Sequence, residues 1–288
     1  IEEASKRSDG LSGVPCGFTA LDRMTSGWQK SDLIIIAARP SMGKTAFVLS
    51  MMRNIAVEHN QGVALFSLEM SAVQLANRLI VGETGLQSDK IKTGKLSDAE
   101  WTQLDVKIKD LAEAPIFIDD TPGISIFELR AKARRLKMTH DIQMVIVDYL
   151  QLMSGDDGNS SREQEVSNIS RGLKAVAKEL DIPIIALSQL NRSVEMRGGD
   201  KRPQISDLRE SGAIEQDADI VTFIYRAERY GITQDEDGNP TKNKAELIVA
   251  KHRNGSIGTV ELKFIDEQAK FMDAEETALG PLDEGGEV

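Results

Sequence analysis

Short, uninterrupted runs of apolar residues recur along this chain, and the longer segments between them place apolar residues three or four positions apart. The short runs, rich in Val and Ile, indicate strands buried on both faces of a parallel sheet, whereas the spaced pattern indicates helices packed against it. Six such strands are predicted, at residues 33–36, 63–68, 115–119, 143–148, 183–189 and 220–225. The pattern therefore predicts an α/β fold with a mostly parallel, twisted sheet flanked by helices.

The ends of the chain depart from this alternation. Two further strands, at 245–251 and 257–264, predict a C-terminal β-hairpin with Asn254 and Gly255 in its turn. We therefore expect one domain at residues 13–265. Residues 1–12 are expected to be a linker, and residues 266–288 an acidic, disordered tail.

The charge balance changes which partners are plausible. The chain has 35 basic and 46 acidic residues, a net charge of −11, which argues against a basic surface that coats nucleic acid. Much of the acidity lies in the expected tail, so a local basic lining elsewhere stays open. The single Cys16 excludes an internal disulfide and fits a reducing cytosol, and no apolar run approaches the length of a membrane span.

The first predicted strand leads into a candidate phosphate-binding loop. The strand is followed by a loop of small residues, then Gly43, Lys44 and Thr45, and then an apolar helix. In this layout backbone N–H groups and the helix N-terminus converge on phosphate oxygens, the Lys44 ammonium adds charge, and the Thr45 hydroxyl can ligate Mg²⁺. Ala38 stands where the usual pattern has its first glycine. The alternative is a chance Gly-Lys-Thr at a strand-to-helix turn.

Three other predicted strands end in polar residues. Glu69 follows the second strand, Asp148 ends the fourth and Gln189 ends the fifth. Open α/β sheets bind ligands at the carboxyl ends of their strands. Glu69 could polarise an attacking water, Asp148 could hold Mg²⁺ beside Thr45, and Gln189 could hydrogen-bond a γ-phosphate. The alternatives are a carboxylate at a helix start for Glu69 and plain polar strand ends for the other two.

A cluster of basic residues marks the helix predicted at 126–139. Its members are Arg130, Lys132, Arg134, Arg135 and Lys137. A solvated helix face is the favoured interpretation, with contact to nucleic acid as the alternative.

Six blocks in order resemble the C-terminal ATPase domain of the bacterial replicative DNA helicases of the DnaB family, which are RecA-like hexameric motors. The blocks are AARPSMGKT (37–45), SLEM (67–70), VIVDYLQLM (145–153), ALSQLNR (186–192), DLRESGAIEQDADIV (207–221) and AKHRNG (250–255). The resemblance covers the chain from about Gly13 to Phe264. It implies a RecA-like P-loop fold that uses ATP and Mg²⁺, and the family is similar at Ala38.

The resemblance also implies roles at the nucleotide. Residues expected to bind it are Ser41, Gly43, Lys44, Thr45, Ala46, Arg78, Lys251 and Arg253. Glu69 is implied as the general base, Gln189 as the γ-phosphate sensor, and Thr45 with Asp148 as the Mg²⁺ site. Lys251 and Arg253 are implied to act on a neighbouring subunit's ATP, Arg253 as an arginine finger.

Partners follow from the same resemblance. It implies a homo-hexamer around single-stranded DNA, with Arg209, Glu210 and Gly212 on the DNA backbone. It also implies a primase, a helicase loader and a cytoplasmic location at the replication fork, without a membrane partner. The family carries an N-terminal domain that this sequence does not include, so residues 1–12 would be the remnant of its linker.

Two other functions compete with an ATP-driven helicase. A RecA-, RadA- or KaiC-like ATPase that binds DNA or partners without unwinding would share Lys44, Glu69 and Asp148. The blocks at 207–221 and 250–255 speak against it, because they resemble the helicases specifically. A non-catalytic clamp would need a degraded site, and the expected catalytic residues are all present.

Overall fold

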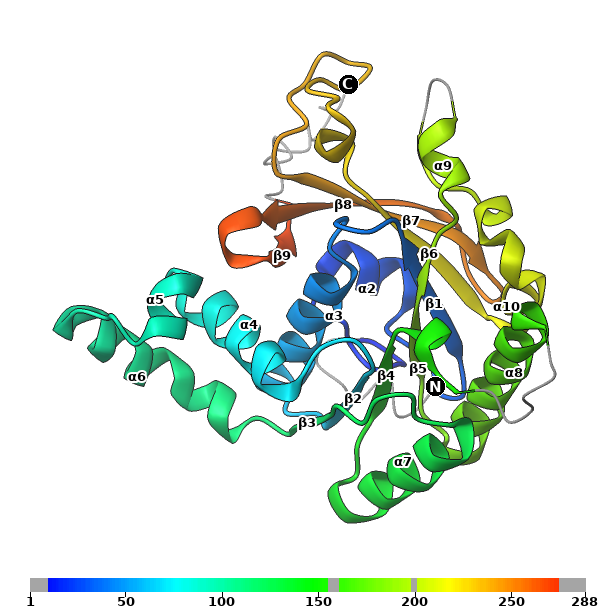
Figure 1. The fold of residues 1–288 in the computed structure, drawn as a ribbon, viewed down its shortest axis with the longest axis horizontal. Coiled ribbons are helices and arrows are strands. Elements are labelled where there is room, and N and C mark those ends of the chain that lie inside the picture. The colour runs from blue at the N-terminus through cyan, green and yellow to red at the C-terminus, as the bar shows by residue number, and fades with distance from the viewer. Residues whose placement is uncertain (1–9, 155–160, 198–200, 275–288) are drawn as a thin grey trace, which may run out of the picture.

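One nine-stranded sheet runs through the computed structural model, which describes residues 10–154, 161–197 and 201–274 (Figure 1). The strands lie in the order β3-β2-β4-β5-β1-β6-β7-β8-β9. Their bounds are β1 Leu33–Ala38, β2 Val63–Ser67, β3 Ile116–Asp119, β4 Met144–Asp148, β5 Ile184–Gln189, β6 Ile220–Tyr225, β7 Lys244–His252, β8 Gly258–Ile265 and β9 Lys270–Asp273. The first six pair in parallel and the last three continue the sheet in antiparallel fashion. The predicted α/β class and mostly parallel sheet are confirmed.

Helices cover both faces of this sheet. The α-helices are α2 Thr19–Thr25, α3 Lys44–Arg53, α4 Ala72–Thr84, α5 Ser88–Thr93, α6 Asp98–Glu113, α7 Ile126–His140, α8 Arg162–Leu180, α9 Ser193–Met196 and α10 Gly212–Asp217. Short helical turns are η1 Asn54–Glu58, η2 Leu150–Leu152, η3 Ile205–Ser211, η4 Ala227–Tyr230 and η5 Asp266–Gln268. None of the described helices is both long and apolar enough to cross a membrane.

The central strand β1 explains the two layers. Alternate side chains of a strand point to opposite faces, so both faces must be apolar when helices cover each of them. Ile34 and Ile36 join the core under α2 and α3, whereas Leu33 and Ile35 join the core under α7 and α8 (Figure 1). All six residues of β1 are buried. The strand can therefore carry chemistry only beyond its ends.

Helices α5 and α6 differ from the rest, because none of their residues is buried. They project away from the sheet in Figure 1. Ser97 nevertheless starts α6 with a capping box, in which its hydroxyl and the Glu100 carboxylate satisfy each other's backbone N–H groups.

The C-terminal end of the domain differs from the prediction. Residues 266–273 were expected to belong to a disordered tail, but they form η5 and strand β9, which pairs with β8. Phe271 is 1% exposed and meets Phe47 edge-on at 5.5 Å. Its N–H donates to the Ser50 hydroxyl at 3.0 Å. The predicted domain end at residue 265 is therefore wrong, because one buried aromatic outweighs the acidic residues around it. Residues 1–9 and 275–288 lie outside the described part of the chain.

Phe271→Ala tests whether β9 belongs to the folded domain. Removing this buried ring should lower the free energy of unfolding by about 3 to 5 kcal/mol. Met272 on the same strand is 43% exposed, so Met272→Ala is the matched control and should change stability little. Chemical denaturation followed by circular dichroism would measure both. Equal, small effects for the two variants would contradict a packed β9.

Candidate nucleotide-binding site

The loop between β1 and α3 lies at the carboxyl edge of the parallel strands. Ala38 is the last residue of β1, an extended position that does not require glycine, which explains why alanine is accepted there. Ser41 and Gly43 both have positive φ, 65° and 97°, so the backbone turns sharply before α3 begins at Lys44. A Cβ on Gly43 would lie 3.0 Å from the Phe271 ring, so this ring packs directly against the loop.

Lys44 is half-buried beside this loop. Its ammonium donates to the carbonyl of Ala38 at 3.1 Å. Burial lowers the pKa of Lys44, and the charges of Asp148 and Glu69 oppose that shift. A phosphate group placed in the loop would supply the counter-charge that the buried ammonium needs.

Thr45 and Asp148 bring a hydroxyl and a carboxylate together. The Thr45 hydroxyl donates to Asp148 Oδ2 at 2.7 Å, and Asp148 is only 2% exposed. Burial raises the pKa of Asp148, opposed by the Thr45 hydrogen bond and the Lys44 charge. Oxygen donors of this kind suit Mg²⁺. In the described ranges no three His, Cys, Asp or Glu residues cluster as a metal site, so phosphate and water oxygens would have to complete such a shell.

Strand register explains why the predicted tips converge. Ala38 lies opposite Gln189, and Ser67 lies opposite Asp148. The Ser67 hydroxyl bonds both the N–H and the carbonyl of Met70, which shapes the turn that presents Glu69. Glu69 and Gln189 are both exposed and line one pocket of about 670 Å³. The predicted residues that line this pocket are Ser41, Gly43, Lys44, Thr45, Ala46, Glu69, Arg78, Asp148 and Gln189.

Lys251 and Arg253 are not in this pocket. The backbone N–H of Arg253 bonds the carbonyl of Asp219, whose own N–H bonds the carbonyl of Leu33. Arg253 is therefore level with the first residue of β1, whereas Lys44 contacts the last one. Five residues of extended strand span roughly 17 Å. The two cations thus lie toward the amino edge of the sheet.

The contacts of these two cations are with α10 and its flank. Lys251 donates to the carbonyls of Glu215 and Ala218, and Arg253 donates to that of Gln216. Arg253 also lies 3.5 Å from the Asp219 carboxylate. Burial and the nearby Arg253 lower the pKa of Lys251. Figure 1 shows α10 beside the turn that joins β7 to β8.

The expected DNA-contacting residues belong to the segment just before this contact. Arg209 and Glu210 lie in η3, and Gly212 begins α10. Their backbone is described, and the side chains of residues 209–213 lie outside the described part of the structure.

Sequence reasoning missed several residues that shape the pocket. Arg226 directly follows β6, is 1% exposed, and lies 3.0 Å from the Asp266 carboxylate. Its guanidinium covers the Phe264 ring at 3.7 Å. Arg229 donates to the Ser41 carbonyl at 3.2 Å, within the loop itself. A polar residue at or just after the end of a buried strand was the signal for Glu69, Asp148 and Gln189, and the same signal would have found Arg226.

Four of the five basic residues on α7 form ion pairs with carboxylates of the same chain, Arg134 among them. Arg130 lies 2.6 Å from Glu179 and Lys132 lies 2.8 Å from Asp119. Lys137 lies 2.7 Å from Asp141. These pairs agree with the favoured interpretation of a solvated face.

Known proteins resemble the chain across nearly all of its length. It is 52% identical over 276 residues to the replicative DNA helicase DnaB of Geobacillus stearothermophilus. It is 50% identical over 276 residues to the replicative DNA helicase DnaC of Bacillus subtilis. In both cases the match covers 96% of this chain and 60% of the relative, so the chain spans about three fifths of their length.

Two solved structures and a family model agree. A structure described as the ATPase domain of G40P superposes with a TM-score of 0.88 at 43% identity, covering 95% of each chain. A DnaB-like replicative helicase, studied with its interactions with primase, gives 0.87 at 43% identity, covering 95% of this chain and 66% of that one. The model of the DnaB-like helicase C-terminal domain matches residues 13–273. The resemblance drawn from the six sequence blocks is confirmed, and the chain belongs to the family of DnaB-like helicase C-terminal domains.

Proposed function

We propose that this chain is the ATP-hydrolysing motor domain of a replicative DNA helicase. It hydrolyses ATP between subunits of a homo-hexameric ring, moves along single-stranded DNA and unwinds the duplex at the replication fork. One observation carries the proposal. The pocket holds Lys44, Thr45, Glu69 and Asp148, while Arg253 lies at the opposite edge of the same sheet.

Within one subunit, different pocket residues bind the phosphates, activate the water and hold Mg²⁺. The loop at Gly43 and the Lys44 ammonium bind the phosphates. Glu69 accepts a proton from the attacking water, and the Gln189 amide hydrogen-bonds the γ-phosphate. Thr45 and Asp148 would hold Mg²⁺, which neutralises phosphate charge when it is bound. Arg78 lines the wall of the same pocket.

Between subunits, Lys251 and Arg253 serve the neighbour's ATP. A guanidinium that enters a neighbouring site stabilises charge in the transition state and makes hydrolysis depend on the interface. Arg253 is 45% exposed at its side chain, so it remains accessible to a neighbour. The nucleotide pocket of the same chain lies at the other end of β1, too far for Arg253 to reach. This separation suits action on the ATP of a neighbouring subunit.

The domain moves along single-stranded DNA. Arg209, Glu210 and the backbone of Gly212 contact the DNA backbone, so binding does not depend on the base sequence. A ring needs positive potential only in its channel, so a net charge of −11 is compatible with this role. Primase, a helicase loader and a cytoplasmic location at the fork complete the proposal. One solved relative was studied with its interactions with primase.

ATPase rate against protein concentration is the first test. The rate per subunit should rise with concentration and with added single-stranded DNA, because each site needs a neighbour's Arg253. A rate that depends on neither would contradict a ring motor and favour a self-contained RecA-like ATPase. Unwinding of a forked DNA by the full-length protein then separates a helicase from an ATPase that only binds DNA.

Glu69→Gln tests the general base. The variant should bind ATP with nearly unchanged affinity but lose at least 100-fold in kcat, because an amide cannot accept the proton (about 10²–10⁴-fold is typical for such a base). Nucleotide binding by fluorescence and phosphate release would measure the two effects. A kcat close to that of the wild type would remove Glu69 from this role.

Arg253→Ala tests action in trans. Alone, the variant should lose about 10³-fold or more in hydrolysis, as for other arginine fingers. Mixing it with Lys44→Ala subunits should restore part of the rate, because some interfaces then pair an intact pocket with an intact Arg253. Absence of any recovery across mixing ratios would argue against a shared site.

A further inference from the structure

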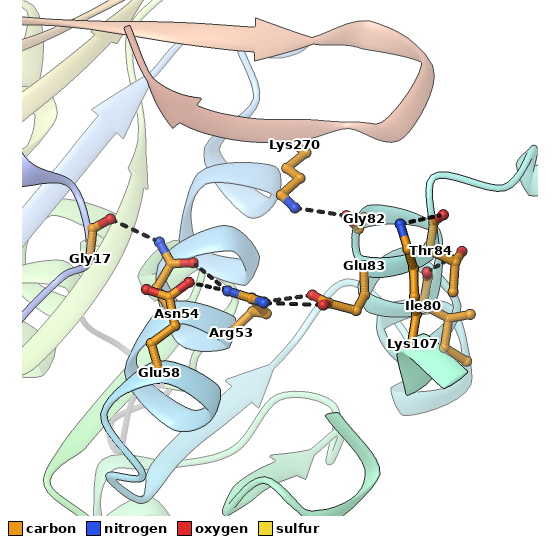
Figure 2. Close-up of polar contacts among 10 residues, drawn as sticks. All are labelled: Gly17, Arg53, Asn54, Glu58, Ile80, Gly82, Glu83, Thr84, Lys107 and Lys270. Atoms are coloured by element: carbon orange, nitrogen blue, oxygen red, sulfur yellow. Dashed lines mark hydrogen bonds and ion pairs between the residues drawn. The ribbon is translucent and has the colours of Figure 1, made fainter. Parts of the chain in front are cut away.

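A group of polar contacts joins three elements behind the nucleotide pocket. Arg53, the last residue of α3, donates to both carboxylate oxygens of Glu83 near the end of α4, at 2.6 and 3.1 Å. Lys270 at the start of β9 donates to the Gly82 carbonyl at 2.9 Å. Figure 2 shows both contacts reaching the last turn of α4 from different sides. We call Arg53, Glu83 and Lys270 the brace.

The Arg53 side chain is itself held in place. It pairs with Glu58 on η1 and donates to the side chain of Asn54 at 3.4 Å. The Asn54 amide donates in turn to the carbonyl of Gly17 at 3.2 Å (Figure 2). The Arg53 and Glu83 side chains are only 20% and 16% exposed. Although burial alone would raise it, the bonds from Arg53 hold the pKa of Glu83 below its usual value.

The brace lies directly behind the wall of the pocket. All three of its residues line a small cavity together with Arg78 and Ala269, and those two residues also line the nucleotide pocket. Val81 precedes Gly82 and lines the nucleotide pocket as well, and Gln268 lies two positions before Lys270. Part of the pocket lining is therefore built from residues adjacent to the brace in sequence and in space.

The brace adds directional bonds to the apolar packing of α4. Contacts such as those between α3 and α4 are non-directional. A two-pronged bond from a guanidinium to a carboxylate fixes both distance and orientation. The pair links the helix that begins at Lys44 to the helix that carries Arg78. Lys270 links the second helix to the segment at 266–269.

We propose that Arg53, Glu83 and Lys270 are positioning residues for nucleotide binding. They hold the segment at 266–269, which lines the pocket from the antiparallel part of the sheet, against the part of the nucleotide that lies beyond its phosphates. This inference rests on the proposed use of ATP. It adds that affinity for the nucleoside end is set by contacts behind the wall, by residues that do not touch the ligand.

Glu83→Gln is the test, with two ligands compared at one protein concentration. A non-hydrolysable fluorescent ATP analogue should bind about five- to twentyfold more weakly, because small misplacements of binding groups are costly. Inorganic triphosphate, which has no nucleoside, should compete with unchanged affinity. In steady state KM for ATP should rise by the same factor, while kcat at saturating ATP stays within about twofold. Arg53→Lys, which keeps the charge but not the fork, should be intermediate.

A matched control separates positioning from plain stability. Asp119→Asn removes the carboxylate of the Lys132–Asp119 pair, which has similar exposure and lies away from the pocket. It should lower the Tm about as much as Glu83→Gln does, without changing affinity for either ligand.

The outcomes are distinct. Unchanged affinity for the analogue in Glu83→Gln, or equal weakening of analogue and triphosphate, would overturn the positioning role. If the wild-type chain bound neither ligand, the proposed function would fail and this inference with it.

Discussion

Burial of the parallel strands on both faces is the constraint on which the site depends. A strand covered on two sides cannot place a charged side chain along its length without a large desolvation cost. The polar residues of β4 and β5 therefore appear at the tips, as Asp148 and Gln189 do. Parallel direction brings those tips to one edge, and β1 adds the loop at the same edge. The pocket follows from that arrangement, since all of its catalytic candidates lie at strand ends or in the segments directly after them.

The antiparallel extension of the sheet places parts of the C-terminal segment at both edges of the sheet. Strand β7 runs back beside β6, so Lys251 near its end and Arg253 just after it lie toward the amino edge. Strand β8 then returns to the loop edge, where Phe264 and Phe271 pack near Gly43. Strands β7 to β9 thereby support the candidate phosphate loop and place two cations far from it.

Sequence patterns predicted what depends on short-range order and missed what depends on tertiary pairing. Apolar runs that end in a polar residue located Asp148 and Gln189 without any knowledge of register. They could not show that Phe271 is buried, because acidic neighbours dominate the composition around a four-residue strand. The Arg53–Glu83 pair was invisible for another reason: its partners are 30 residues apart, and no spacing rule joins them.

Under the proposed function, α10 connects the expected DNA-contacting segment to the cations that act on a neighbouring subunit. Its last carbonyls accept bonds from Lys251 and Arg253, and its first residue follows directly on η3. A six-residue helix is short and stiff, about 9 Å long. A displacement at its start is therefore transmitted to its end with little loss. Under the proposed function, DNA that pulls on Gly212 also moves the carbonyls that hold Lys251 and Arg253. The two sites are then connected through α10 itself.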